Sequence, residues 1–467
     1  MKHYDVVVLG AGSAGELIAN TLAGAGRTVA LIEKLRVGGE CAYVSCIPSK
    51  AMLRSVTARR TAKNLVSLGG ASSAIQLDDD AVAYRSAASR RDRIAKFRND
   101  ERAASHTRDV GVELIRGDGV FTGVDSIQVE SEVFGWTDLV LAMGSSSTIP
   151  DIEGVRDIDY WTSDMALSVT ELPKSVLIVG GGPVGCELAQ IFSGFGAKTT
   201  VVQSSKQLAG KEHPEIASRL AQNLRTSGVT VLLDTNVTKL EKESNKNTVA
   251  HLSNKTLLSV ERVIIAAGRH PNTSDIDILL LGVSPNEKGA VVVDESCRVV
   301  GHPHIWAAGD VTGIAPFTHT ANYQGRIVAA NIMGGSEVAN YSAIPRAIYT
   351  DPPVASVGQM KSVEKEDELV TSRIELSQES RNDTDGEVGG LLILTADPKR
   401  GVLVGAAAIG PHVDEWMAEA TLAIRAQIPL AVLCDVVHAF PTYGEAFEQP
   451  LRELAGLSEE SQANNFN

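Results

Sequence analysis

The feature that most constrains the fold is a glycine-rich turn between two apolar runs near the start of the chain. Residues 5–10 form an apolar run of the kind that a buried parallel strand shows, and a segment with helical spacing follows the turn. Gly10, Gly12 and Gly15 give the spacing G-x-G-x-x-G, and the next apolar run ends in Glu33. Together these features predict a dinucleotide-binding βαβ unit and a parallel sheet.

Each part of this unit has a chemical reason. The glycines let the backbone approach a pyrophosphate at the helix N-terminus, where unpaired N–H groups favour an anion. Glu33 would accept hydrogen bonds from ribose hydroxyl groups. A glycine pattern alone is weak evidence, and the acid at the end of the second strand makes it strong.

A second unit of the same kind follows the apolar run 175–179. Gly180, Gly182 and Gly185 repeat the glycine spacing. Two Rossmann-type units in one chain imply two bound nucleotides. The obvious pair is FAD, held throughout catalysis, and a nicotinamide nucleotide that binds and leaves.

The second strand of this later unit ends in Gln203 instead of an acid. An acid at that position normally holds the ribose 2′-hydroxyl of NAD and repels the 2′-phosphate of NADP. Gln203 removes the repulsion, and residues 204–206 (Ser, Ser, Lys) could donate to a phosphate. Both NADH and NADPH remain open, with a slight preference for NADPH.

A pair of cysteines lies between the two units. Cys41 and Cys46 are five positions apart, and Pro48 and Lys50 follow them at the start of an expected helix. A thiolate is favoured at a helix N-terminus by the unpaired N–H groups and by the dipole. Two buried small residues or half of a zinc site are the alternatives, but no second cysteine pair completes a zinc site.

Composition narrows the function further. The 467 residues carry a formal net charge of −14, which argues against a nucleic-acid partner. No apolar run approaches the length of a membrane helix, and no signal peptide precedes the first strand. The other cysteines, Cys186, Cys297 and Cys434, are scattered among apolar residues. These features indicate a soluble protein of a reducing cytoplasm.

The segment from Gly38 to Lys50 resembles the redox-active motif of the class I pyridine nucleotide-disulfide oxidoreductases. This family includes dihydrolipoamide dehydrogenase, glutathione reductase, mycothione reductase and mercuric reductase. The resemblance implies an α/β fold with two Rossmann-like domains, the FAD domain split by the NAD(P)H domain, and a C-terminal α+β dimerisation domain. The implied boundaries are 1–150 and 271–340 for FAD, 151–270 for NAD(P)H and 341–467 for dimerisation, with a disordered tail from about residue 458.

The resemblance also assigns roles to residues. Cys41 and Cys46 form the redox-active disulfide, Cys46 facing the flavin and Cys41 exchanging with substrate, and Lys50 pairs with Glu187 beside the flavin. The residues implied in binding FAD and NAD(P)H are Gly10, Gly12, Ser13, Ala14, Gly15, Glu33, Lys34, Gly38, Gly39, Glu40, Cys41, Lys50, Gly119, Val120, Ala142, Gly144, Ser145, Gly180, Gly182, Pro183, Val184, Gly185, Glu187, Gln203, Val237, Gly268, Arg269, Gly309, Asp310 and Thr318.

The C-terminal segment departs from the family pattern. The family has H-P-x-x-x-E, in which the histidine serves as acid–base for the dithiol in the other subunit's site. Here Phe440 stands before Pro441, Glu445 takes the place of the glutamate, and His438 lies two residues too early. Residues two apart on an extended segment lie roughly 6–7 Å apart, so His438 does not simply replace the missing histidine. It is either a displaced catalyst or a structural histidine.

The sequence therefore predicts a homodimeric NAD(P)H-dependent flavoprotein that exchanges electrons with a small disulfide or dithiol, similar to dihydrolipoamide dehydrogenase. Because Phe440 cannot transfer a proton, a quinone or metal-ion reductase on the same scaffold is the alternative. A nucleotide-binding flavoprotein sensor is a third hypothesis. The set Cys41, Cys46, Lys50 and Glu187 argues against it, because a protein that only binds nucleotides needs none of these residues.

Overall fold

The computed structural model describes residues 1–243, 247–274, 276–359, 369–386 and 388–456. The tail expected to be disordered from about residue 458 lies outside these ranges. The chain divides into two compact units. Unit 1 contains residues 1–48, 89–149 and 268–340, and unit 2 contains residues 49–88, 150–267 and the chain from residue 341 onward. Each unit holds a glycine turn that follows a parallel strand of its sheet, which confirms the α/β class with two Rossmann-like domains.

Unit 1 is built on a sheet with the strand order β3-β2-β1-β6-β5-β4, and β16 pairs with β6. Its strands are β1 (Lys2–Leu9), β2 (Val29–Glu33), β3 (Glu113–Arg116), β4 (Gly119–Gly123), β5 (Ser126–Val129), β6 (Glu132–Leu141) and β16 (Ile305–Ala307). The pairs that β1 forms with β2 and β6 are parallel, whereas β4, β5 and β6 form an antiparallel meander. The glycine turn therefore leaves the carboxyl end of a central parallel strand, where α/β proteins bind nucleotides.

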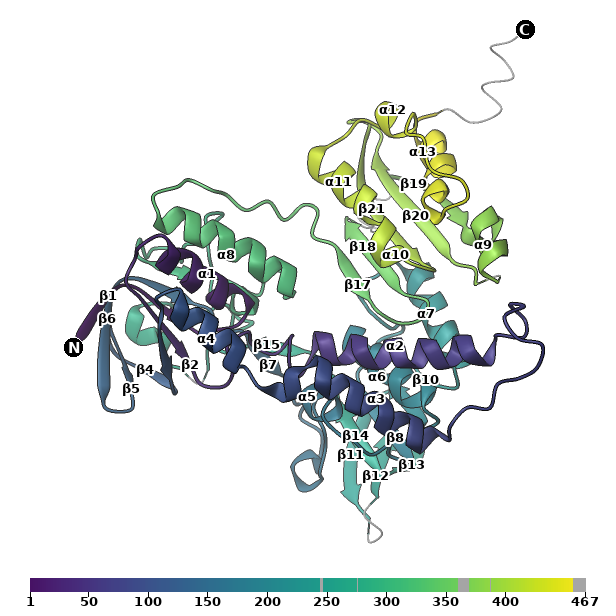
Figure 1. Cartoon of the computed structure of the whole chain (residues 1–467), viewed down its shortest axis with the longest axis horizontal. Helices are drawn as coiled ribbons and strands as arrows, with labels where there is room; N and C mark the ends of the chain where they lie inside the picture. The colour runs from purple at the N-terminus through teal and green to yellow at the C-terminus, as the bar shows by residue number, and fades with distance from the viewer. Residues whose placement is uncertain (244–246, 275, 360–368, 387, 457–467) are drawn as a thin grey trace. The chain divides into compact units, whose positions relative to one another are not determined.

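Strand β1 is buried on both faces. Val6 and Val8 belong to one apolar cluster, and Val7 and Leu9 belong to another on the opposite face. This alternation explains why the strand appears in the sequence as a continuous apolar run. Helices α1 (Ser13–Gly24) and α8 (Thr318–Ile332) lie side by side in Figure 1 and contribute to the first cluster.

The sequence of residues 51–110 predicts one helix, a Gly/Ser/Asp-rich break near 69–80 and a second long helix rich in arginine, and the structure departs from this prediction. Helix α2 (Cys46–Lys63) forms as expected, but the second helix is interrupted: α3 (Asp80–Ile94) is followed by the short 3-10 turn η1 (Lys96–Arg98) and by α4 (Glu101–Asp109). Lys96, Phe97 and Arg98 all have φ between 52° and 61°. This left-handed backbone conformation cannot continue an α-helix, so the chain changes direction there.

Unit 2 contains the second parallel sheet, in the order β10-β9-β8-β14. Its strands are β8 (Ser175–Val179), β9 (Lys198–Val202), β10 (Thr230–Leu232) and β14 (Arg262–Ile265). Helices α6 (Pro183–Gly194) and α7 (Pro214–Thr226) and the antiparallel strands β11 (Val237–Lys242), β12 (Thr248–Leu252) and β13 (Leu257–Val260) complete this part. Proline begins both helices, at the position where a missing N–H costs nothing.

The C-terminal part of unit 2 is an antiparallel sheet in the order β17-β18-β21-β20-β19. Its strands are β17 (Arg346–Ile348), β18 (Val354–Gly358), β19 (Val370–Glu375), β20 (Leu391–Asp397) and β21 (Val402–Ile409), and its helices are α9 (Ser380–Asp385), α10 (Val413–Trp416), α11 (Ala418–Ala426), α12 (Leu430–Leu433) and α13 (Glu448–Leu454). One face of this sheet packs into a core with α11, α12 and α13. The opposite face packs into the same core as β8 and α6.

Candidate active site

The two cysteines are joined in a disulfide whose Cα atoms are 4.6 Å apart. The Glu40 carbonyl accepts hydrogen bonds from the backbone N–H groups of three residues of the loop between the cysteines. The Cys41 carbonyl accepts from the N–H of Ile47 at 2.9 Å, and α2 begins at Cys46. The loop is therefore one tight turn that leads directly into a helix, and the backbone contacts that hold it do not involve the sulfur atoms.

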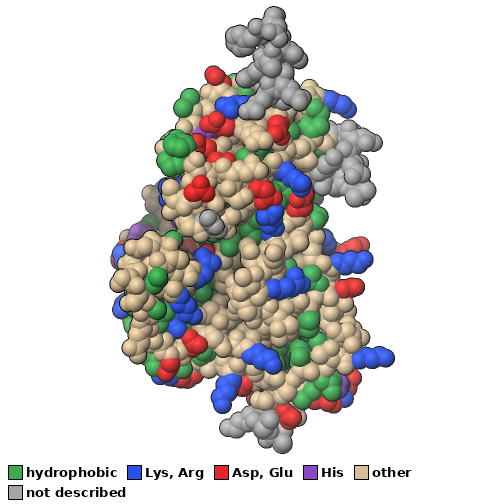
Figure 2. Space-filling view, turned by 90° about the vertical axis from the view of Figure 1, so that its right-hand side faces the viewer, with side chains coloured by type: hydrophobic (Ala, Val, Ile, Leu, Met, Phe, Trp, Pro, Cys, Tyr) green, Lys and Arg blue, Asp and Glu red, His purple; other side chains and the backbone are tan. Residues whose placement is uncertain are grey.

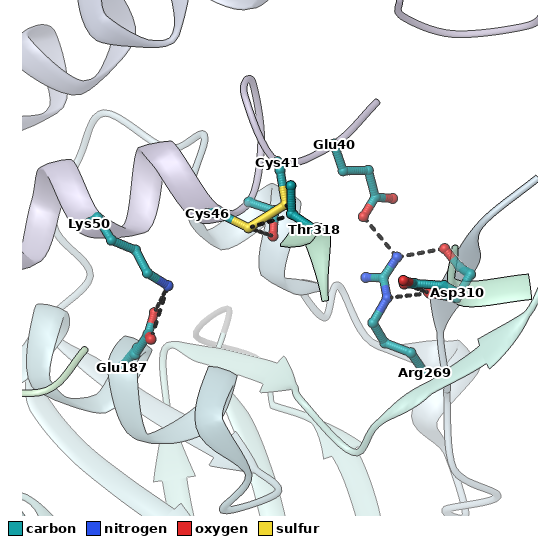
Figure 3. The surroundings of a disulfide bond; sticks show 10 residues. Glu40, Cys41, Cys46, Lys50, Glu187, Arg269, Asp310 and Thr318 are labelled. Atoms are coloured by element: carbon teal, nitrogen blue, oxygen red, sulfur yellow. Dashed lines mark hydrogen bonds and ion pairs between the residues drawn. A yellow bond between two sulfur atoms is a disulfide. The ribbon is translucent and has the colours of Figure 1, made fainter. Parts of the chain in front are cut away.

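Thr318, the first residue of α8, lies against the disulfide (Figure 3). Its hydroxyl donates to Cys41 Sγ at 2.7 Å and lies 3.9 Å from Cys46 Sγ. Thr318 was expected as a cofactor-binding residue, and the described contacts place it on the sulfur atoms. The starts of two helices thus meet at the disulfide, and both favour negative charge on sulfur after reduction.

In the first glycine turn, the neighbouring backbone leaves no room for a side chain at Gly10 or Gly15, whereas Gly12 faces open space. A Cβ atom on Gly15 would lie 1.9 Å from the Gly10 carbonyl oxygen, and one on Gly39 would lie 2.9 Å from Gly12 Cα. Glu33 Oε2 accepts from the N–H of Ala11 at 2.7 Å, so the carboxylate lies against the turn. A cradle of bare backbone beside a carboxylate fits the pyrophosphate and ribose of a dinucleotide such as FAD.

A continuous line of polar contacts lies on the same unit. Arg269 Nη2 donates to Glu40 Oε2 at 2.8 Å, and its Nε donates to Ser145 Oγ at 2.8 Å. Ser145 Oγ donates in turn to Asp310 Oδ2 at 2.6 Å. Arg269 and Ser145 lie on the paired short strands β15 (Arg269–Pro271) and β7 (Ser145–Ser147). The structure therefore brings together four residues that come from distant parts of the sequence.

The other residues of unit 1 that were expected to bind FAD lie on several elements of this unit. Gly119 and Val120 begin β4, where Gly119 is buried and Val120 is exposed. Ala142 N donates to the Leu9 carbonyl, which fixes the end of β6 beside the glycine turn. Lys34 is exposed and pairs with Asp118. Ser13 and Ala14 begin α1, Gly38 and Gly39 precede the disulfide loop, Gly144 and Gly268 flank β7 and β15, and Gly309 precedes Asp310.

Asn272 was not expected in the site, yet it supports the line of polar contacts. Its Nδ2 donates to the Met143 carbonyl at 2.8 Å, and its N–H donates to the Gly144 carbonyl at 3.0 Å. These bonds hold the turn that carries Ser145. A single asparagine in a loop gives no sequence signal for this role.

The Lys50–Glu187 ion pair lies in unit 2 (Figure 3). Lys50 Nζ donates to the two carboxylate oxygens of Glu187 at 2.7 and 3.0 Å. The side chain of Glu187 is 7% exposed, and that of Lys50 is 33% exposed. Tyr349 was not expected in the site: its N–H donates to Glu187 at 3.0 Å, and its ring lies 4.5 Å from Lys50 Nζ. The glutamate is therefore fixed by two partners.

The second glycine turn repeats the geometry of the first. A Cβ atom on Gly185 would lie 2.0 Å from the Gly180 carbonyl oxygen. Gln203 Oε1 accepts from the N–H of Gly181 at 2.8 Å, and its Nε2 donates to Ser205 Oγ at 2.6 Å. Gly182 precedes α6, Pro183 and Val184 begin it, and Val237 is buried at the start of β11. The turn fits a dinucleotide and presents an uncharged amide where an acid is usual.

The C-terminal segment places His438 between two carboxylates. Its Nε2 lies 3.0 Å from Glu419 Oε2, and its Nδ1 lies 3.3 Å from Glu448 Oε1. Both ring nitrogens are thus engaged within the same domain, whereas Phe440 is 74% exposed. Glu445 accepts from the N–H of Thr442 in a capping box, so this carboxylate holds its own turn.

The described residues show no cluster of three or more His, Cys, Asp or Glu side chains arranged to hold a metal ion. None of the described helices combines the length and the apolarity that a membrane crossing requires.

A redox disulfide in one unit and a glycine turn in each unit define an oxidoreductase that works with two dinucleotides and one cysteine pair.

Comparison with known proteins identifies the family. The family model described as "Pyridine nucleotide-disulphide oxidoreductase" matches residues 4–325. The model of the dimerisation domain of the same family matches residues 344–451. The chain therefore belongs to the pyridine nucleotide-disulphide oxidoreductase family, whose members are FAD-dependent enzymes that use pyridine nucleotides.

Relatives in this family act on different substrates. The chain is 30% identical to a mercuric reductase of Streptomyces lividans over 455 residues, covering 95% of each chain. It is 29% identical to a dihydrolipoyl dehydrogenase of Chlamydia trachomatis serovar D, covering 96% of each chain. The HOCl-induced flavoprotein disulfide reductase RclA of Escherichia coli, also solved as a Cu(II) complex, has a similar structure, with a TM-score of 0.84, 26% identity, and coverage of 96% of this chain and 99% of RclA.

Proposed function

We propose that this enzyme transfers two electrons from NAD(P)H through bound FAD to the Cys41–Cys46 disulfide, and from the resulting dithiol to a small disulfide. The balanced reaction is NAD(P)H + H⁺ + RSSR → NAD(P)⁺ + 2 RSH. The observation that carries the proposal is the disulfide itself: it closes a tight turn at the start of α2, under the hydroxyl of Thr318. With a dithiol donor the same groups would run the reaction in reverse.

Each residue has a distinct role in this proposal. FAD, when bound, supplies the two-electron relay between nicotinamide and disulfide, held by the glycine turn at Gly10–Gly15, by Glu33 and by Asp310. Cys41 attacks the substrate disulfide and forms a mixed disulfide, and Cys46 then releases the second thiol by attacking Cys41. The Thr318 hydroxyl stabilises the thiolate form by hydrogen bonding, and the turn at Gly180–Gly185 holds NADH or NADPH.

A quinone or a metal ion is the second candidate acceptor, and the C-terminal segment favours it. Disulfide exchange needs a proton delivered to the leaving thiolate, and a positioned acid–base group is worth roughly 10²–10⁴-fold. Phe440 cannot supply that proton, and His438 is engaged by two carboxylates. Reduction of a quinone or a metal ion has less need of such a group. One relative is a mercuric reductase, and RclA has been solved as a Cu(II) complex.

The proposal includes a homodimer. The matched dimerisation domain carries large apolar side chains that the described chain leaves exposed, including Leu422, Val432, Val437 and Phe440. Exposed apolar side chains of this size would be buried if they gathered in an interface with another protein molecule. A second copy of the chain is the partner that the family assignment suggests.

Steady-state assays of the FAD-loaded protein would test the acceptor. Lipoamide, low-molecular-weight disulfides, quinones, Hg²⁺ and Cu²⁺ would each be offered with NADH and with NADPH, and Cys46→Ser would serve as the control. Reduction of at least one acceptor that is lost in Cys46→Ser supports the proposal. Equal turnover by both proteins would show that electrons bypass the disulfide. A protein that binds both nucleotides but reduces none of these acceptors would favour a sensor.

A further inference from the structure

A cavity of about 820 Å³ lies in unit 1 beside the disulfide loop. One wall comes from Ala42 and Tyr43 of the loop itself and from Ile47, which directly follows Cys46. The other walls are the end of α3, the turn η1 and the start of α4. This volume is typical of small-molecule sites. A molecule in the cavity would therefore contact residues adjacent in sequence to both redox-active cysteines.

The charged side chains that line the cavity are all basic. They are Arg93, Lys96 and Arg102, and His106 lies beside them. Within the described part of the chain, no carboxylate pairs with any of these three cations. The arginines nearby that lie outside the cavity are paired: Arg98 with Asp92, Arg108 with Glu101, and Arg116 with Asp100.

The charge around the cavity is opposite in sign to the net charge of the chain. The whole chain carries a formal net charge of −14. On the face shown in Figure 2, basic and acidic side chains lie interspersed. Three cations that form no ion pair with a described carboxylate thus line one cavity, and its concave walls of low dielectric would strengthen their attraction for an anion.

The turn η1 also supports a binding role. Lys96, Phe97 and Arg98 hold positive φ values of 53°, 52° and 61°, a conformation that costs free energy for residues with side chains. Phe97 is 71% exposed, so burial of its ring in the core does not compensate for that cost. The turn instead brings an aromatic ring and a lysine to the edge of the cavity, where Tyr43 provides a second ring.

We propose that this cavity is the acceptor site and that it selects acceptors carrying negative charge, as carboxylate or phosphate, on an aromatic or apolar body. Arg93, Lys96 and Arg102 attract the anionic group, and Phe97 and Tyr43 contact the body. This inference rests on the proposed function, since it assumes that an acceptor must reach the cysteines. It adds the chemical class of that acceptor, which the redox machinery alone does not define.

The test compares two aromatic disulfides that differ in charge. Dithiobis(nitrobenzoate) carries two carboxylates, and dithiodipyridine is neutral. The FAD-loaded wild-type protein would be assayed with both, beside Arg93→Gln, Lys96→Gln, Arg102→Gln and the triple variant. Arg27→Gln is the matched control, because Arg27 is an exposed arginine of unit 1 outside the cavity. FAD content and circular dichroism would verify folding, and the single variants keep the test valid if the triple variant misfolds.

We expect the ratio of kcat/KM for the anionic probe to kcat/KM for the neutral probe to fall about threefold in each single variant and at least about tenfold in the triple variant. In the wild-type protein, kcat/KM for the anionic probe should fall as ionic strength rises, and this dependence should flatten in the triple variant. Arg27→Gln should keep the wild-type ratio. An unchanged ratio in all pocket variants would overturn the proposal.

A binding measurement separates this proposal from the proposed function. Naphthalenesulfonate is an aromatic anion that cannot be reduced through a disulfide, and calorimetry would measure its affinity for the wild-type protein and for the variants. Binding that weakens at least about tenfold in the triple variant supports the cavity even if no disulfide is turned over. Absent binding, or binding that the substitutions leave unchanged, contradicts the cavity even if disulfide turnover is fast.

Discussion

The side-chain carbonyl of Gln203 accepts a hydrogen bond from the N–H of Gly181 at 2.8 Å, as Glu33 does from Ala11 at 2.7 Å. Both side chains come from the end of the second strand of a βαβ unit, and both hold the glycine turn of that unit. The two units therefore share one structural contact but differ by one negative charge. Gln203 keeps the turn in place and leaves room for a 2′-phosphate without like-charge repulsion.

The first prediction concerns nucleotide choice. The wild-type enzyme should discriminate between NADH and NADPH by less than about a hundredfold, because a full clash with an unpaired charge would cost several kcal/mol. Gln203→Glu should lower kcat/KM for NADPH by at least about tenfold and shift the preference toward NADH. Gln203→Ala is the control, because it removes the contact with Gly181 without adding charge. In this variant kcat/KM should fall by similar factors for NADH and for NADPH. Strong NADH selectivity in the wild-type protein would show that another residue recognises the ribose.

The second prediction assigns the two cysteines. Anaerobic titration with dithionite should give a two-electron-reduced form with long-wavelength absorption from a thiolate beside the oxidised flavin. Cys46→Ser should abolish this absorption, since Cys46 is the proposed flavin-facing thiolate at the start of α2. Cys41→Ser keeps a thiolate at Cys46 but has no disulfide to reduce, so it should show the absorption before dithionite is added and lose it as dithionite reduces the flavin. The opposite pattern in the two variants would exchange the roles of the cysteines.

The third prediction tests Thr318. The Thr318 hydroxyl donates to Cys41 Sγ. In the reduced protein such a bond stabilises the Cys41 thiolate and lowers the pKa of the Cys41 thiol, so Thr318→Val should raise the pKa of that thiol. A rise of about one unit corresponds to the loss of about 1.4 kcal/mol of differential stabilisation. The pH dependence of iodoacetamide labelling of the reduced protein would measure the shift. Thr320→Val, in the same helix turn, is the matched control. If both variants label with the wild-type pH profile, Thr318 does not act on the thiolate.

The fourth prediction concerns the C-terminal segment. His438→Ala should leave disulfide turnover nearly unchanged and reduce the free energy of unfolding by roughly 1–3 kcal/mol, because Glu419 and Glu448 lose a shared partner. Phe440→His should raise disulfide turnover by about tenfold or more if the new imidazole reaches the partner subunit's site. Urea denaturation and steady-state assays would measure these effects. Fast lipoamide turnover in the wild-type protein that disappears in His438→Ala would make His438 the acid–base instead.

Local patterns in the sequence were sufficient to predict both glycine turns, the start of α2 and the cysteine pair, because each depends on residues close together in the chain. The interruption at Phe97 could not be predicted in this way, because lysine, phenylalanine and arginine carry no turn signal for the positive φ values that they adopt. The contact between the N–H of Tyr349 and Glu187 was equally hidden, since any non-proline residue can donate a backbone hydrogen bond.

The shared core of unit 2 has a consequence for how the enzyme melts. The match to the first family model ends at residue 325, and the match to the dimerisation-domain model begins at residue 344. These bounds divide the chain into two modules, the nucleotide-binding part and the dimerisation domain. Yet Ile348, Val354 and Ile393 of the dimerisation domain lie in one apolar cluster with Val176 and Phe192 of the nucleotide-binding sheet and helix. Burial of each such side chain contributes roughly 1.5–3 kcal/mol. We therefore expect the two modules to unfold together, and a chain cut between residues 325 and 344 to expose part of this shared core in both fragments.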